Sequence, residues 1–255
     1  MNIKVVVAYH KPCIYIKDDV YLPIQAGAEG NQTLGIQPDN QGINISQKNS
    51  YLNEMTVLYW AWKNLDSDYI GLAHYRRFFT TKCFIAKLFC RNKIDLIARK
   101  SDYEVLLNSC DIILPSKRKY YIETIESHFK HLPYTINEDL DILRDVINNH
   151  FAEYSQAFES VMNRNWGHMF NMLLMSKQKL DEYCTWAFDV LEECDRRIEW
   201  VGREPIQARM YISEFLLDTW IETRKYRYCE MNVIYTEKQN WFMKIGRFVV
   251  RKIYN

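Results

Sequence analysis

The stretch "DYIGLAHYRRFF", residues 68–79, joins a short apolar run to a cluster of cations. Residues 69–73 are apolar and bounded by polar residues, a pattern typical of a buried strand in a parallel sheet. His74, Arg76 and Arg77 follow this run directly. Because open α/β sheets bind ligands at the carboxyl ends of their strands, the stretch predicts a site for an anionic or hydrogen-bonding ligand.

The rest of the chain alternates between strand and helix patterns. Residues 23–50 are rich in Gly, Asn and Gln and predict a long functional loop. A basic cluster, residues 117–119, follows a second apolar run in the way that the cations follow residues 69–73. Alternation of this kind indicates an α/β fold. Strands are expected at 3–9, 69–73, 111–115, 169–175 and 232–235, and helices at 50–64, 138–149, 152–162, 178–196 and 205–223.

Composition narrows the class of protein. The chain has 255 residues, which suits one large domain, and its net charge of +1 argues against a nucleic-acid partner. Seven scattered cysteines without a C-x-x-C pair predict reduced thiols in a cytoplasmic protein. There is no P-loop, no G-x-G-x-x-G fingerprint, no H-E-x-x-H zinc motif and no G-x-S-x-G elbow.

The C-terminal residues form a separate pattern. We expect one α/β domain over residues 1–236 and a basic amphipathic tail over 237–255. On a helical wheel, Trp241, Ile245 and Phe248 share one side, while Lys244 and Arg247 lie on another. The tail over 241–254 therefore suits either a peripheral contact with the inner face of the plasma membrane or a terminal helix packed on the domain.

Several segments together resemble a known family. The segments are "NISQKNSYLNEMTVLYWAWKNLDSDYIGLAHYRRFF", "DIILPSKRKYYIETIESHF", "EDLDILRDVI", "YSQAFESVMNRNWGHMFNMLLMSK" and "ARMYISEFLLDTWI", in this order between residues 44 and 220. They resemble bacterial capsular and exopolysaccharide glycosyltransferases of the domain family marked by a His-Tyr-Arg-Arg motif. The resemblance implies a single GT-A-like domain, a Rossmann-type mixed sheet flanked by helices. It also implies sugar transfer from a nucleotide diphosphate donor, UDP-hexose or UDP-galactofuranose, to a lipid-linked or saccharide acceptor in capsule, exopolysaccharide or O-antigen synthesis.

The resemblance also gives the cationic stretch a role. In most GT-A enzymes an Asp-x-Asp motif at this strand end holds a divalent metal, whereas here the strand ends in His74-Tyr75-Arg76. Asp66 and Asp68 spell such a motif but precede the strand. We therefore expect His74, Arg76 and Arg77 to bind the donor diphosphate without a metal, with His74 also catalytic. The alternative is that the arginines pair with surface carboxylates such as Asp66 or Asp68.

Two further groups of residues are candidates for contacts with the substrates. Asn44, Lys48, Asn49 and Glu54 surround the start of a helix and are expected to contact the nucleotide, with capping and solvation as the alternative. A separate set is expected to act on the sugar or the acceptor. In that set Glu214 is the candidate general base, and His168, Asn171 and Asp111 are candidate hydroxyl-binding residues.

No cofactor or metal is expected to be required. A second reading of the same sequence is a catalytically silent nucleotide-sugar or saccharide-binding scaffold of a polysaccharide assembly complex. A third, an RNA-binding module, is disfavoured by the near-zero net charge and by the lack of an RNP-type motif.

Overall fold

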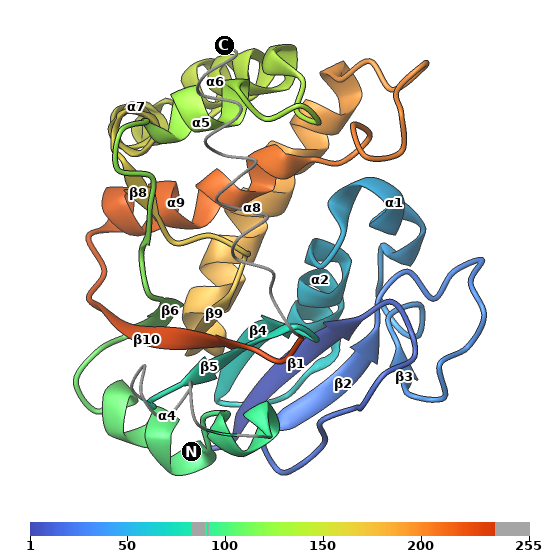
Figure 1. Cartoon of the computed structure of the whole chain (residues 1–255). Helices are drawn as coiled ribbons and strands as arrows, with labels where there is room; N and C mark the ends of the chain where they lie inside the picture. Colours follow the sequence, from blue (N-terminus) through green and yellow to red (C-terminus); the bar gives the residue numbers. More distant parts are fainter. Residues whose placement is uncertain (83–89, 91, 238–255) are drawn as a thin grey trace.

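The computed structural model describes residues 1–82, 90 and 92–237 (Figure 1). The amphipathic tail predicted at 241–254 lies outside the described residues, as does all but the first residue of the expected segment 237–255. Across the part of the chain that is described, none of the helices is long and apolar enough to cross a membrane.

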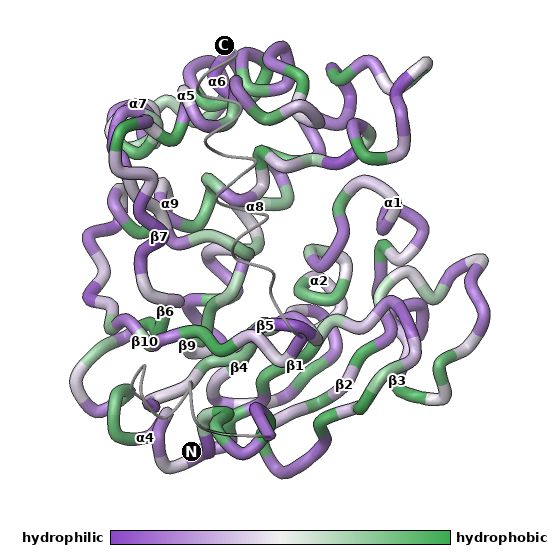
Figure 2. The backbone as a smooth tube through the Cα atoms, viewed as in Figure 1, coloured by the Kyte–Doolittle hydropathy of each residue, from purple (hydrophilic) through white to green (hydrophobic). Residues whose placement is uncertain are grey.

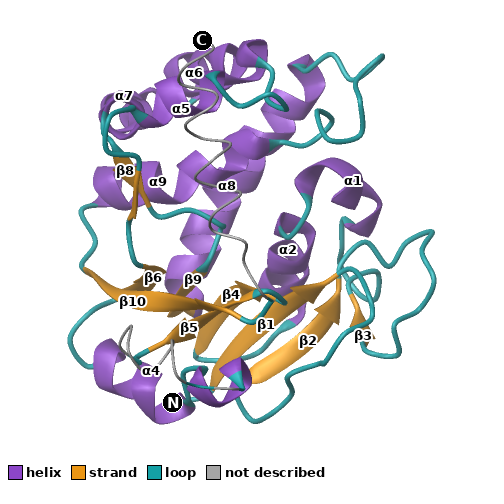
Figure 3. Cartoon of the chain, in the orientation of Figure 1, coloured by secondary structure: helices purple, strands orange, loops and turns teal. Residues whose placement is uncertain are grey.

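The core of the molecule is a mixed sheet of eight strands (Figure 3). Its order is β3-β2-β1-β4-β5-β10-β6-β9. A separate two-stranded ribbon pairs β7 with β8. The strands are β1 Ile3–Tyr9, β2 Tyr21–Gln25, β3 Gln37–Pro38, β4 Tyr69–His74, β5 Arg77–Thr80, β6 Ile112–Pro115, β7 Arg118–Lys119, β8 Trp166–Gly167, β9 Leu173–Ser176 and β10 Tyr228–Tyr235.

One half of the sheet is parallel. β1 lies between β2 and β4, parallel to both, in a register that sets Ala8 opposite His74. Residues of β1 and β4 are buried on both faces, which is why each strand reads as a continuous apolar run (Figure 2). This half confirms the strands expected at 3–9 and 69–73.

In the other half of the sheet, the strands pair in a closed ring. β4 also pairs antiparallel with β9 and β5, and β9, β6, β10 and β5 complete a ring. A Cβ added to Gly71 would lie 2.7 Å from the carbonyl oxygen of Leu173, so this pairing needs a glycine in β4. The mixed α/β sheet was expected. The simple Rossmann-type sheet was not an adequate description, because part of the sheet forms a small barrel.

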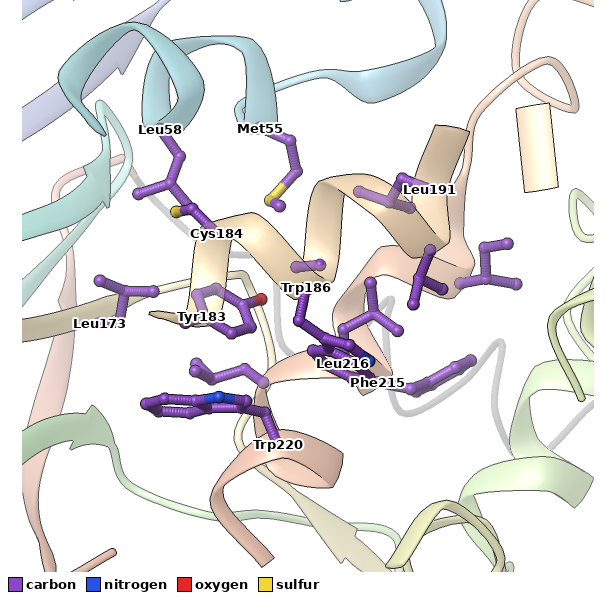
Figure 4. Close-up of a cluster of buried hydrophobic side chains, with 14 of the residues drawn as sticks. Met55, Leu58, Leu173, Tyr183, Cys184, Trp186, Leu191, Phe215, Leu216 and Trp220 are labelled. Carbon is purple, nitrogen blue, oxygen red and sulfur yellow. The ribbon is translucent and has the colours of Figure 1, made fainter. Parts of the chain in front are cut away.

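Most helices gather above one face of the sheet, and α4 lies on the opposite side (Figure 1). α8 packs between α2 and α9, and its Tyr183, Cys184 and Trp186 fill the space between them (Figure 4). The α-helices are α1 Asn49–Leu52, α2 Met55–Asn64, α4 Lys100–Leu107, α5 Ile125–Lys130, α6 Asn137–His150, α7 Ser155–Asn163, α8 Lys177–Arg197 and α9 Leu216–Arg224; the 3-10 helices are η1 Ser46–Lys48, η2 Lys93–Leu96, η3 Ala152–Tyr154 and η4 Tyr211–Phe215.

Several expected elements differ from the structure: the helix expected at 152–162 is η3 followed by α7, the strand expected at 232–235 begins already at Tyr228, and three further elements differ as follows. The helix expected at 50–64 breaks between α1 and α2, because Asn53 has φ 50° and ψ −128°, outside the helical region. The strand expected at 169–175 begins only at Leu173, after two residues with positive φ, Phe170 and Asn171. The helix expected at 205–223 is η4 followed by α9, and residues 205–210 are not helical.

A buried carboxylate organises the long loop that the sequence predicted at 23–50. Asp39 is fully buried and accepts hydrogen bonds from the backbone nitrogens of Gly27 (2.8 Å) and Ala28 (2.9 Å). It also accepts from the hydroxyls of Ser46 and Thr56. This one side chain therefore ties the end of β2 to η1 and to the start of α2.

We expect Asp39→Ala to lower the free energy of unfolding by about 3 kcal/mol or more, because four donors, three of them in buried hydrogen bonds, lose their acceptor together. Urea denaturation followed by circular dichroism would measure the change. Asp19→Ala removes a carboxylate at an exposed position and should stay within about 0.5 kcal/mol of the wild type. Equal stability of the two variants would contradict the organising role of Asp39.

Candidate functional site

A cavity of about 890 Å³ opens at the carboxyl ends of β1 and β4. It lies where the fold class predicts a ligand site. Basic residues outnumber acidic ones in its lining. The charged and ring-bearing polar residues of the lining are His10, Lys11, Glu54, His74, Arg76, Arg77, Arg118, Tyr120, His128, Tyr134, Arg209, Tyr211 and Glu214.

The parallel pairing of β1 and β4 brings two histidines together at one wall. The backbone nitrogen of Tyr75 donates to the carbonyl of Ala8 at 3.2 Å, continuing the β1–β4 ladder past the strand ends. As a result, the rings of His10 and His74 have centroids 6.0 Å apart. The sequence reasoning found His74 and missed His10, although His10 also follows an apolar strand directly.

His74 is held as a neutral hydrogen-bond donor. Burial, together with the charges of the nearby Arg77 and Arg76, lowers the pKa of His74 to about 2. Its Nδ1 accepts from the backbone nitrogen of Arg76 at 3.4 Å, so in the neutral ring the proton lies on Nε2. His74 therefore offers the cavity an N–H group without a positive charge.

The positive charge comes from the arginines beside it. The Nε atoms of Arg76 and Arg77 are buried, and no described residue hydrogen-bonds to either. Arg76 Nε lies 4.0 Å from a carboxylate oxygen of Glu237, and the Arg77 guanidinium lies 4.2 Å from the centre of the Phe170 ring. Arg118 reaches the same ring from β7, at 6.0 Å. Guanidinium donors without a hydrogen-bond acceptor, in side chains that line a cavity, are suited to an oxyanion.

The alternative, pairing with surface carboxylates, holds in part for Arg76, which forms an ion pair with Glu237, but not with the suggested Asp66 or Asp68. Asp68 lies at the other end of β4, where its carboxylate accepts from the backbone nitrogen of Asn2 at 2.7 Å. The carboxylates that spell Asp-x-Asp therefore do not reach the end of β4 that lines the cavity. Within residues 1–82, 90 and 92–237, no group of three His, Cys, Asp or Glu side chains is placed to hold a metal ion.

A polar wall faces the cations. Asn171 donates from Nδ2 to Glu54 Oε1 at 3.0 Å and to Ser213 Oγ at 3.3 Å. Glu214 accepts from the backbone nitrogen of Phe170 at 3.3 Å. Phe170 and Asn171 have φ of 80° and 52°, a costly conformation for residues other than glycine that is typical of functional sites.

Glu214 has the electrostatic character of a base. Burial raises the pKa of its carboxyl and the nearby Glu54 raises it further, whereas the Phe170 N–H, Arg118 and Arg77 oppose this increase. A carboxylate with a raised pKa is a stronger base than one in water. The side chain is still partly exposed and lines the cavity, where a substrate can reach it.

Some predicted site residues do not line the cavity. Asn44 bonds within its own turn, to Gly42 and Ser46, and Lys48 pairs with Asp195 at 2.9 Å. Asn49 does line the cavity, but its amide is engaged by Asn53 and Thr56. These three residues make structural contacts, although none of them caps the N-terminus of η1, α1 or α2 with its side chain, as the alternative of capping and solvation supposed.

His168 and Asp111 are also absent from the cavity lining. His168 is 1% exposed, and its Nδ1 lies 2.6 Å from a carboxylate oxygen of Asp218. Asp111 lies before β6, at the end of that strand away from Arg118, and its carboxylate is 3.7 Å from Arg227. Neither residue is placed to contact a ligand in this cavity.

The sequence reasoning left several lining residues unassigned. Arg118 belongs to the basic cluster that follows a strand, which was the available signal. Tyr120, His128, Tyr134 and Arg209 carry no local pattern that separates them from ordinary core or surface residues. Only tertiary structure brings them to the cavity.

Comparisons with known proteins agree with this architecture. A family model described as "Domain of unknown function (DUF4422)" matches residues 4–225. A solved structure of the WbbM bifunctional glycosyltransferase, in its apo form, superposes with a TM-score of 0.82 at 23% sequence identity. The match covers 93% of this chain and 46% of that one, so the chain spans less than half the length of that protein. No curated protein matches the sequence significantly.

We expect the His74 ring to stay neutral with its proton on Nε2 from about pH 5 to pH 8, since burial and the two arginines keep its pKa far below that range. The ¹⁵N ring shifts in two-dimensional NMR spectra would show this, with His74→Asn identifying the signals. A titration midpoint near that of an ordinary histidine would contradict the assignment.

Proposed function

We propose that the chain, which belongs to the DUF4422 family, is a glycosyltransferase that uses a nucleotide diphosphate sugar as its donor. The observation that carries the proposal is that a cationic wall and a carboxylate with a raised pKa line the same cavity. Its fold is also that of a solved glycosyltransferase structure. Fold alone does not establish chemistry, so the proposal rests on the residues of the site.

The cationic wall suits the diphosphate. Arg76, Arg77 and the neutral His74 ring all line the cavity beside the end of β4, and the Nε donors of both arginines have no hydrogen-bond partner among the described residues. When the bond between the sugar C1 and the diphosphate oxygen breaks, the electron pair leaves with the diphosphate. Fixed donors that are already aimed at this charge stabilise it without reorganising.

The Glu214 carboxylate is suited to activating the acceptor hydroxyl. The acceptor hydroxyl oxygen forms the new bond to C1, and its proton passes to the Glu214 carboxylate. This role is supported by the short path from Glu214 to the cations: Phe170, whose N–H donates to Glu214, lies against the guanidinium of Arg77. Donor and acceptor would then meet between the two walls.

The residues at this strand end do not fit a divalent metal. A metal site would need carboxylate oxygens, but the end of β4 supplies imidazole and guanidinium groups. Arg76, Arg77 and His74 would therefore take over the neutralisation of the leaving group. We propose that transfer needs no added cofactor.

The finer assignments follow the resemblance described above. We propose UDP-hexose or UDP-galactofuranose as the donor and a lipid-linked or saccharide acceptor, in the assembly of a capsular, exopolysaccharide or O-antigen repeat unit. Such acceptors place the reaction at the cytoplasmic face of the inner membrane. Binding of nucleotide sugars without transfer to any such acceptor, and without hydrolysis, would instead favour the scaffold function.

We expect Glu214→Gln to slow transfer by about 100-fold or more while nucleotide-sugar binding is retained, because the amide cannot accept the acceptor proton. Release of nucleoside diphosphate measures turnover, and calorimetry measures binding. Glu138→Gln, at an exposed position in the first turn of α6, is the matched control. Unchanged turnover in the Glu214 variant would reject its role as the base.

The same assignment fixes the direction of the pH dependence. The base works only when ionised, so kcat/KM should fall as the pH drops through the raised pKa of Glu214, above the value of 4.5 for an ordinary glutamate. An acidic limb that is unchanged in Glu214→Gln would show that another group titrates.

Transfer should be unaffected by excess EDTA, because the leaving group meets fixed cations. The rate of nucleoside diphosphate release before and after chelation, with Mn²⁺ or Mg²⁺ added back, measures this. Strict dependence on either ion would contradict the proposed metal-independent site.

A further inference from the structure

We propose that the site selects a neutral donor sugar, whose hydroxyls are read by Glu54 and Asn171, and that it rejects sugars bearing a carboxylate. This inference rests on the proposed glycosyltransferase function and specifies its substrate class. It assigns Glu54 to the sugar, in place of the nucleotide contact that its position before α2 suggested.

The two residues proposed to bind the sugar hydroxyls are far apart in the sequence. Glu54 and Asn171 both line the cavity, and the hydrogen bond between them, Nδ2 to Oε1, is 3.0 Å long. Ser213 accepts a second bond from the same Nδ2. These contacts fix the amide orientation, so Asn171 turns its Oδ1 away from both partners.

Asn171 Oδ1 is an unsatisfied acceptor. The side chain is only 5% exposed, and Oδ1 has no hydrogen-bond partner among the described residues. A buried polar atom without a partner is costly and suggests a missing ligand group. That group must donate a hydrogen bond, which a sugar hydroxyl can do and a phosphate dianion or a carboxylate cannot.

Backbone continuity places this group next to the diphosphate wall. Phe170, on which Arg77 stacks, directly precedes Asn171, and its N–H donates to Glu214. Both residues have left-handed φ values, a strained conformation that the surrounding contacts must maintain. A ligand with its phosphates on the arginines would therefore place the adjoining sugar ring against Glu54 and Asn171.

The negative charge of the carboxylates near the proposed sugar position then determines which donor sugars bind. Glu54 and Glu214 are the two acidic residues of the described lining. They lie close enough for Glu54 to raise the pKa of Glu214. A uronic acid would add another carboxylate to this region, and repulsion between like charges a few ångströms apart changes affinity by roughly tenfold or more. A neutral hexose avoids this cost.

The test compares matched pairs of nucleotide sugars by calorimetry: UDP-glucose with UDP-glucuronic acid, UDP-galactose with UDP-galacturonic acid, and GDP-mannose with GDP-mannuronic acid. For each pair that the wild type binds, we expect the neutral nucleotide sugar to bind at least about tenfold more tightly than the corresponding uronic acid. Glu54→Gln should reduce this preference to about threefold or less, since it removes one repelling charge. The glutamine amide oxygen can still accept from Asn171, so the fold is retained, which thermal melting would check.

Glu138→Gln removes a carboxylate outside the cavity and should keep the full preference. Equal or tighter binding of the uronic acids by the wild type would overturn the inference whether or not the variant folds, and would point to Arg118 as their partner. A preference that persists unchanged in Glu54→Gln would also overturn it. UDP and GDP alone separate the two proposals: if neither they nor any nucleotide sugar binds, the proposed function fails as well, whereas binding without sugar preference overturns only this inference.

Discussion

The site depends on the antiparallel pairing of β4 with β9, which Gly71 permits. Leu72 lies opposite Leu173 in this pairing. The register therefore brings the residues just before β9 to the carboxyl end of β4, where the cations are. Without this closure of the sheet, Phe170 and Asn171 would not lie beside Arg77, and the two walls of the cavity would be separate. A glycine with no ligand contact thus determines the geometry of the chemistry.

A cluster of buried charged side chains supports the wall of the cavity that carries Asn171 and Glu214. Asp218 of α9 accepts from the His168 backbone nitrogen at 2.9 Å, pairs with its ring and contacts Arg164. Burial opposes ionisation of Asp218, but the hydrogen bond from His168 and the charge of Arg164 keep its pKa below the ordinary value. This cluster ties the segment before Phe170 to the helix that follows Glu214. His168, predicted from sequence to contact a substrate, is placed to position the residues that line the cavity.

The sequence predicted the features that depend on local pattern. Continuous apolar runs located β1 and β4, and the cations after β4 located one wall of the cavity, because a strand end is visible in a single stretch of chain. The break at Asn53 was missed, since the loop contacts that hold its unusual backbone are tertiary. The contact between Glu54 and Asn171 joins residues 117 positions apart, and no periodicity encodes it. The barrel-like closure was missed for the same reason.

The fixed cations have a consequence for the end of the catalytic cycle, if the donor is a nucleotide sugar as proposed. The released nucleoside diphosphate carries more negative charge than the donor did, so Arg76 and Arg77 hold the product more tightly than the substrate. A dissociable metal can leave together with a diphosphate, but the arginine side chains between β4 and β5 and at the start of β5 cannot. Product departure, rather than bond breaking, would then limit turnover, and the enzyme would be sensitive to accumulated nucleotide.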